Sequence, residues 1–343
     1  MTRVAAVDCG TNSIRLLICD SLGEATREIT RTMEIVRLGQ GVDATGEQDP
    51  VAIERPRAAL SRFVETREFE EVKAVRMVAT SATRDASNRD DFFRMTAELL
   101  GRITPGAQAE VISGEEEAAL SFRGAITDLN PSDGPFCVID LGGGSTEFIV
   151  GTADGEILGA HSAQMGCVRV TERIMRSDPP TDTETEIAME YIGERLSAER
   201  SLLLAAKART SGGVAGLETY DPREIHGSVL NFSALRLLTA EIRRQTAETR
   251  GLNPVVHPGR ADVLGGGSAV VDGIMDMIAA QTSVDSFVIS EKDILDGIVA
   301  GLGDRLRAGW HRKSGGSSTR TPFPLVFGLG RVPVPFALLR RLR

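Results

Sequence analysis

The stretch Val7-Asp8-Cys9-Gly10-Thr11-Asn12-Ser13, followed by the strand-like segment 14–18, occurs again 132 residues later. The second copy is Ile139-Asp140-Leu141-Gly142-Gly143-Gly144-Ser145, followed by the segment 146–150. Aspartate, glycine and serine align without a gap. Each copy predicts two buried strands joined by a tight glycine turn. Two such hairpins predict two similar α/β domains, with a phosphate chain and a metal ion held between the facing loops.

Composition narrows the class of protein. A chain of 343 residues is too long for one ordinary core and predicts two domains. No run of roughly 18 apolar residues is present, so we expect no membrane span. The N-terminus enters a strand without an export leader, and the four cysteines form no C-x-x-C pair, so we expect a cytoplasmic protein with free thiols.

The net charge of −9 argues against nucleic acid as a partner. A small polyanionic substrate is compatible with this charge, because local arginines and a metal ion can offset the surrounding negative field.

Turn signals and periodicity give an expected organisation. We expect a first domain at 1–128, joined by a C-terminal helix at 291–308, a second domain at 129–290, and a flexible tail at 309–343. Strands are predicted at 4–7, 14–19, 29–36, 72–79, 109–112, 157–162 and 283–289, besides the second hairpin. Helices are predicted at 51–68, 90–100, 114–127, 184–206, 233–250, 268–280 and 291–308.

The two loops are the candidate phosphate sites. In the first loop, Gly10 permits the turn, while Thr11, Asn12 and Ser13 offer backbone N–H groups and small polar side chains. In the second loop, Gly142, Gly143 and Gly144 lie between two good strands. Such a run destabilises a hairpin unless the backbone turns sharply or approaches a ligand closely. Ser145 adds a hydroxyl. The alternative for the first loop is an ordinary turn that Asp8 caps.

Several acidic residues are candidates for metal binding or catalysis. Asp8 and Asp140 end their strands, and Glu147 shares a strand face with Ser145, so these three are candidate Mg²⁺ ligands. Glu147 is otherwise a solvated strand residue. In the helix that follows Ser113, Glu116 fits a capping box and Glu117 faces small residues, where a ligand can approach it. A solvated Glu117 is the alternative.

Arginines and further glycine turns complete the candidate set. Arg84 follows a buried strand and can clamp a phosphate or pair with a neighbouring aspartate. Arg169 and Arg260 are further substrate-binding candidates. Glycine turns are predicted at 211–213 and 264–268, with Ser268 capping the helix that begins there.

The motifs 7–13, 113–118, 140–147 and 260–262 resemble the exopolyphosphatase / guanosine pentaphosphate phosphohydrolase family, over about residues 3–308. The resemblance is to the short form, without a C-terminal HD-type domain. It implies two ribonuclease-H-like domains of the actin–sugar kinase–Hsp70 type with an interdomain cleft. It places the family's catalytic glutamate on Glu117, the second-loop aspartate on Asp140 and the phosphate-clamping arginine on Arg84. It also implies a homodimer formed through the second domain.

The expected activity is Mg²⁺-dependent release of terminal phosphate from inorganic polyphosphate, with Glu117 deprotonating the attacking water. Three alternatives remain. Guanosine pentaphosphate can be the substrate of the same chemistry. A kinase of this fold is suggested by residues 263–268, which resemble an adenosine-binding turn. A sensor would bind ligand without turnover.

Overall fold

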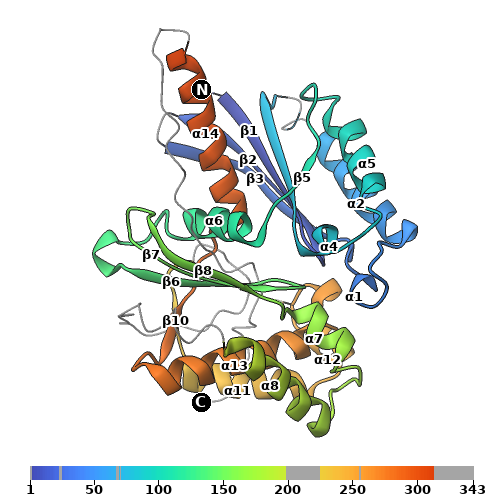
Figure 1. Ribbon diagram of the computed structural model, residues 1–343, viewed down its shortest axis with the longest axis vertical. Helices are drawn as coiled ribbons and strands as arrows, with labels where there is room; N and C mark the ends of the chain where they lie inside the picture. Colours follow the sequence, from blue (N-terminus) through green and yellow to red (C-terminus); the bar gives the residue numbers. More distant parts are fainter. Residues whose placement is uncertain are drawn as a thin grey trace. The chain divides into compact units, whose positions relative to one another are not determined.

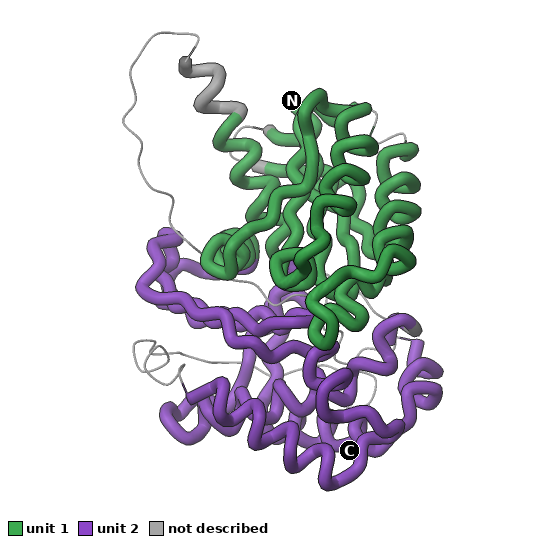
Figure 2. Tube along the Cα trace, turned by 45° about the vertical axis from the view of Figure 1, so that its right-hand side comes forward, with its two compact units in different colours: residues 1–124, 293–325 green, residues 125–292, 326–343 purple. Residues whose placement is uncertain are grey.

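The computed structural model describes residues 2–22, 25–66, 69, 71–197, 225–254 and 256–312 (Figure 1). The chain forms two compact units. Of the described residues, unit 1 contains those up to 124 and those from 293 to 312, and unit 2 contains those from 125 to 292 (Figure 2). Among the described residues, no helix is both long enough and apolar enough to cross a membrane.

Unit 1 is built on a five-stranded mixed sheet with the strand order β3-β2-β1-β4-β5. Its first three strands are antiparallel neighbours, and β4 and β5 run parallel to β1. The strands are β1 (Thr2–Cys9), β2 (Ser13–Leu22), β3 (Ala25–Ile35), β4 (Ala74–Ala79) and β5 (Ala109–Val111). The helices are α1 (Val42–Thr45), α2 (Pro50–Val64), α4 (Ser81–Arg84), α5 (Asp90–Leu100), α6 (Gly114–Ala125) and α14 (Ile294–Arg312).

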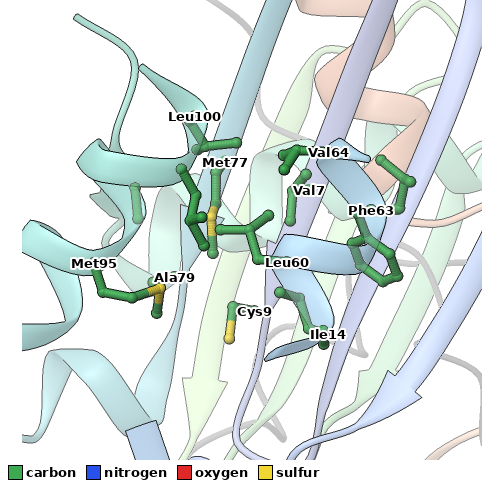
Figure 3. Packing of buried hydrophobic residues seen from close by; sticks show 14 of the residues in the cluster. Val7, Cys9, Ile14, Leu60, Phe63, Val64, Met77, Ala79, Met95 and Leu100 are labelled. Carbon is green, nitrogen blue, oxygen red and sulfur yellow. The ribbon is translucent and has the colours of Figure 1, made fainter. Parts of the chain in front are cut away.

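Side chains alternate between the two faces of this sheet, and each face packs against different helices. On β1, Val7 and Cys9 pack toward Leu60 of α2 and Met95 of α5, with α2 and α5 covering this face (Figures 1 and 3). Val4 and Ala6 point the other way and pack against α14. Asp8 follows the same alternation, so the sequence places its carboxylate on the α14 face.

Glycines allow α6 and α14 to approach closely within unit 1. A Cβ on Gly297 would lie 1.9 Å from the backbone oxygen of Leu120, and one on Gly124 would lie 1.8 Å from that of Asp293. Any side chain at either position would force the helices apart. The contact fixes the helix that carries Glu117 against the start of α14.

Unit 2 contains a three-stranded antiparallel sheet of order β6-β7-β8 and a pair of short strands, β9 and β10. The strands are β6 (Phe136–Leu141), β7 (Thr146–Gly151), β8 (Ile157–Ala163), β9 (Val229–Asn231) and β10 (Ser286–Val288). The helices are α7 (Cys167–Arg173), α8 (Asp182–Leu196), α11 (Phe232–Arg244), α12 (Ala247–Gly251) and α13 (Leu264–Gln281), with 3-10 turns η1 (Pro131–Asp133) and η2 (Pro258–Arg260). The central helix α13 packs against α7, α8 and α11.

Three sequence expectations for helices and turns are wrong. The glycines at 265–267 do not form a turn but lie in the first turn of α13, and Ser268 donates to the carbonyl of Gly265 instead of capping a helix start. The helix expected over 233–250 is interrupted at Gln245, whose extended backbone separates α11 from α12. Helix α14 continues to Arg312, four residues into the expected tail. The glycine turn predicted at 211–213 and the tail beyond 312 lie outside the described residues.

Candidate active site

The first loop joins β1 to β2 and is held through its carbonyl groups. Gly10 N–H donates to the Ser13 carbonyl over 2.9 Å, which closes the turn. The carbonyl of Thr11 accepts from Gly39, and the carbonyl of Asn12 accepts from Val36 and Arg37 (all 2.9 Å). In a planar trans peptide the N–H points opposite to the C=O. The N–H groups of Asn12 and Ser13 therefore point away from the segment 36–39.

The second loop joins β6 to β7 and repeats this arrangement. Gly142 N–H donates to the Ser145 carbonyl over 2.9 Å, the counterpart of the Gly10 bond 132 residues earlier. The carbonyls of Gly142 and Gly143 accept from the first turn of α7. No described residue accepts a hydrogen bond from the N–H groups of Gly143, Gly144 or Ser145. Consecutive N–H groups left in this way form a concavity that attracts anions.

Asp8 lies in a buried ion-pair network on the α14 face of the unit 1 sheet. Its partner across the β1–β2 ladder is Arg15, which donates to Asp8 Oδ2 from Nε over 2.9 Å and also donates to Asp293 Oδ2 over 2.6 Å. The other oxygen, Asp8 Oδ1, is buried without a hydrogen-bond partner among the described residues. Burial raises the pKa of Asp8, and the charge of Arg15 opposes that rise.

Asp140 and Glu147 are direct cross-strand partners in unit 2, so both carboxylates lie on one sheet face. Glu147 is only 1% exposed, and Ser162, its partner on β8, donates a 2.8 Å hydrogen bond to Glu147 Oε1. Like charges directly opposite each other destabilise a sheet. A cation bound beside them would offset that repulsion.

No group of three or more histidine, cysteine, aspartate or glutamate side chains placed to hold a metal occurs among the described residues. Asp140 and Glu147 still suit Mg²⁺. It prefers oxygen ligands and usually keeps several waters, so two carboxylates can suffice. Asp8 suits it less, because Arg15 already occupies one of its oxygens.

Glu117 and Arg84 lie together in unit 1. Arg84 Nη1 donates to Glu117 Oε2 over 3.1 Å and to the Ile112 carbonyl over 3.0 Å. Glu117 is 9% exposed. Its neighbour Glu116 makes only half of the expected capping box. The backbone N–H of Glu116 donates to Ser113 Oγ, as the capping box predicts, while the Glu116 side chain pairs with buried Arg76.

A hydroxyl pair connects the first loop to α4. Thr11 Oγ1 and Ser81 Oγ are 2.8 Å apart and buried. Since one proton suffices for that bond, the second hydroxyl proton remains for another acceptor. The structure thus brings the first loop, α4 with Arg84, and Glu117 together within unit 1.

The other two predicted arginines lie near the second loop in unit 2. Arg169 Nε donates to the Gly144 carbonyl over 2.8 Å. Arg260 lies in η2, near Cys167 at the start of α7. Burial raises the pKa of the Cys167 thiol to about 11, and the positive charge of Arg260 opposes that rise.

Sequence reasoning missed Arg15, Ser81, Ser162 and Asp293 as members of these clusters. One signal could have found Arg15. It lies 132 residues before Glu147, so the repeat places it at the equivalent position. The contacts of Ser81, Ser162 and Asp293 depend on strand register or on residues far apart in the chain, so the motifs do not predict them.

Known proteins resemble this chain in both sequence and structure. The model of the Ppx/GppA phosphatase family matches residues 17–301. Exopolyphosphatase 2 of Mycobacterium tuberculosis is 46% identical over 317 residues, which cover 88% of this chain and 99% of that protein. The crystal structure of an exopolyphosphatase-like protein is 38% identical with a TM-score of 0.79, covering 89% of this chain and all of that one.

A Ppx/GppA family member from Aquifex aeolicus is 27% identical with a TM-score of 0.69, covering 90% of this chain and 98% of that one. These structures confirm the predicted α/β fold class. The length of the match and the identity lead to one conclusion: the chain belongs to the Ppx/GppA phosphatase family.

Proposed function

We propose that this protein is an exopolyphosphatase that hydrolyses the terminal phosphoanhydride bond of inorganic polyphosphate. The observation that carries the proposal is the repeated loop. In both copies the carbonyl groups are held by neighbouring backbone, while successive N–H groups remain for an anion. A relative 46% identical over most of the chain bears the name exopolyphosphatase 2, which supports polyphosphate as the anion.

Phosphoryl transfer depends on positioning and on neutralising charge, and the described residues suit both tasks. The loop N–H groups bind phosphate oxygens, and Arg84 adds a positive charge beside Glu117. Glu117 accepts the proton of a water that attacks the terminal phosphorus. The bond to the bridging oxygen breaks, and the shortened polyphosphate leaves. When bound, Mg²⁺ on Asp140 and Glu147 would neutralise charge on the phosphates.

The test of Glu117 is a pair of matched variants. Glu117→Gln keeps the side-chain shape and removes the base, so phosphate release should fall roughly 10²- to 10⁴-fold with an unchanged Tm. Glu115→Gln is the control, because Glu115 lies exposed on the same helical turn. Malachite-green measurement of phosphate release decides the outcome. Wild-type rates in Glu117→Gln would remove this residue from the mechanism.

The family name covers a second substrate, guanosine pentaphosphate, whose 5′-terminal phosphoanhydride suits the same groups. Comparing wild-type rates on short polyphosphate, long polyphosphate, guanosine pentaphosphate and ATP separates the two substrates. A kinase would leave polyphosphate intact and form ADP only with an acceptor, and a sensor would bind without turnover.

The candidate carboxylates support Mg²⁺ as the ion, and the sequence resemblance supports a homodimer formed through unit 2. A cytoplasmic location is also part of this proposal. All four cysteines are free, which suits a reducing compartment. Removal of metal with EDTA should abolish turnover, and Mg²⁺ should restore it. Light scattering of the purified protein at several concentrations tests the dimer.

A further inference from the structure

The glycine run of the second loop is held from one side by α7. The carbonyl of Gly142 accepts from Cys167 N–H over 3.0 Å. The carbonyl of Gly143 accepts from Val168 over 2.9 Å and from Arg169 over 3.1 Å. The backbone N–H groups in the first turn of α7 therefore donate to the carbonyl groups of the loop.

The third carbonyl of the run, that of Gly144, is bonded by a side chain. Arg169 reaches back from α7 and donates from Nε over 2.8 Å. Because each peptide N–H points opposite to the preceding carbonyl, this set of bonds turns the N–H groups of Gly143, Gly144 and Ser145 away from α7. Arg169 is thus responsible for the direction of the last of the three, the N–H of Ser145.

The residue before α7 is as constrained as Arg169. A Cβ on Gly166 would lie 2.4 Å from both the carbonyl carbon and the oxygen of Gly143, and 2.7 Å from the nitrogen of Gly144. Backbone atoms cannot rotate aside as a flexible side chain can. The loop and the start of α7 can pack in this way only with glycine at position 166.

We propose that Arg169 is a positioning residue that aims the N–H groups of the second loop at the substrate phosphate. This inference rests on the proposed function and revises the expectation that Arg169 binds substrate itself. Its contribution comes from a hydrogen bond to backbone, so a neutral donor at the same place should serve nearly as well as a charge.

Three substitutions separate a positioning role from a charge contact. Gln places its amide nitrogen the same number of bonds from Cα as Arg Nε, Met fills similar space without a donor, and Lys keeps the charge. We expect kcat/KM to fall roughly 10- to 100-fold in Arg169→Met but no more than about threefold in Arg169→Gln, because small displacements of catalytic groups are costly. A Tm measured for each variant controls for folding.

Equilibrium binding of tripolyphosphate to the intact protein gives a readout that does not depend on turnover. The affinity for tripolyphosphate should weaken in the same order as kcat/KM, so that Arg169→Met binds it much more weakly than Arg169→Gln. If the variants show this order of tripolyphosphate affinity but the wild-type protein hydrolyses no phosphoanhydride bond, the proposed function fails and the positioning role stands. If Lys preserves binding while Gln loses as much as Met, Arg169 contacts phosphate through its charge and the proposal is overturned.

A second pair of variants tests the loop without touching Arg169. Gly166→Ala must displace the glycine run, so it should reduce both tripolyphosphate affinity and kcat by at least roughly tenfold. Gly193→Ala is the matched control in the same unit, since a Cβ there meets nothing within 4 Å. Wild-type kcat and affinity in Gly166→Ala would show that the loop does not need this support.

Discussion

Asp8 and Asp140 occupy equivalent positions in the two hairpins, but the residues opposite them carry opposite charges. Arg15 faces Asp8, and Glu147 faces Asp140. The first pair is neutral in sum, and Arg15 continues the network to Asp293. The second pair concentrates two negative charges on one sheet face. The repeat has therefore kept its backbone while the electrostatics of its two copies differ.

This difference predicts an unequal response to magnesium. Glu147→Gln removes one of two adjacent carboxylates and should raise the Mg²⁺ concentration for half-maximal activity by at least roughly tenfold, because hard oxygen ligands dominate Mg²⁺ binding. Asp8→Asn should raise this Mg²⁺ concentration less, since Arg15 already donates to one Asp8 oxygen. Magnesium titrations of phosphate release measure both. An equal shift in the two variants would place Asp8 among the direct ligands.

A second residue-level prediction concerns acid stability. Asp20 lies opposite both Arg3 and Arg27 in the sheet. Their hydrogen bonds lower its pKa from the ordinary 3.8 to about 2. A depressed folded pKa means that the ionised carboxylate stabilises the fold above about pH 4, and that this stabilisation is lost as the pH falls toward 2.

Asp20→Asn should therefore be less stable than wild type at pH 7, and the difference should shrink as the pH approaches 2. Urea unfolding at a series of pH values measures it. A difference that stays constant over this range would mean that the ionised form of Asp20 contributes nothing.

At the scale of elements, the crossing of α6 and α14 depends on glycine. Gly297→Ala would place a methyl group 1.9 Å from the Leu120 carbonyl oxygen and should cost about 1–3 kcal/mol of unfolding free energy through overpacking. Gly301→Ala is the control on the same helix. Its nearest neighbour is Arg123 Nη1 at 4.0 Å, so it should stabilise by about 0.5–1 kcal/mol. Chemical denaturation of both variants measures the contrast, and similar effects would contradict the close crossing.

Most elements of this fold could be predicted from alternation and turn residues. The helix expected at 90–100 is α5, and both hairpins occur where the repeated motif places them. The turn predicted at 264–268 was wrong because a run of glycines, here 265–267, usually marks a turn. In α13 they serve helix packing instead. A Cβ on Gly266 would lie 2.4 Å from Thr171 Oγ1 and 2.7 Å from the Cys167 carbonyl.

The candidate site was predictable only in part. Motifs identified the loops, Glu117 and Arg84 by residue type, and the structure places the last two in contact. The partners that orient these groups were not predictable from local pattern. Arg15 meets Asp293 across 278 positions of chain, and Arg169 donates to the Gly144 carbonyl of the second loop. Such contacts follow from register and helix packing, which no short motif encodes.

At the scale of the whole molecule, unit 1 is discontinuous in sequence. Helix α14 supplies one covering layer of its sheet, and Ile298 is fully buried there. Ile298→Ala should cost about 2–5 kcal/mol, because it leaves a cavity. Arg305→Ala, at an exposed position of the same helix, is the control. Thermal unfolding measures both.

A chain ended after Lys292 makes the stronger test. It lacks every α14 residue of this core and should lose the cooperative unfolding of unit 1, as followed by circular dichroism. A truncated chain that unfolds like the intact one would show that the sheet is stable with that face bare.

The same discontinuity has a consequence for biosynthesis. At about 5–20 residues per second, roughly 10–30 s of translation separate residue 124 from α14. During that interval the apolar face of the nascent sheet lacks helix α14, because Val4, Ala6, Leu17 and Val78 await a segment not yet made. We therefore expect a ribosome-associated chaperone to improve the yield of this protein more than that of a chain whose domains are sequential.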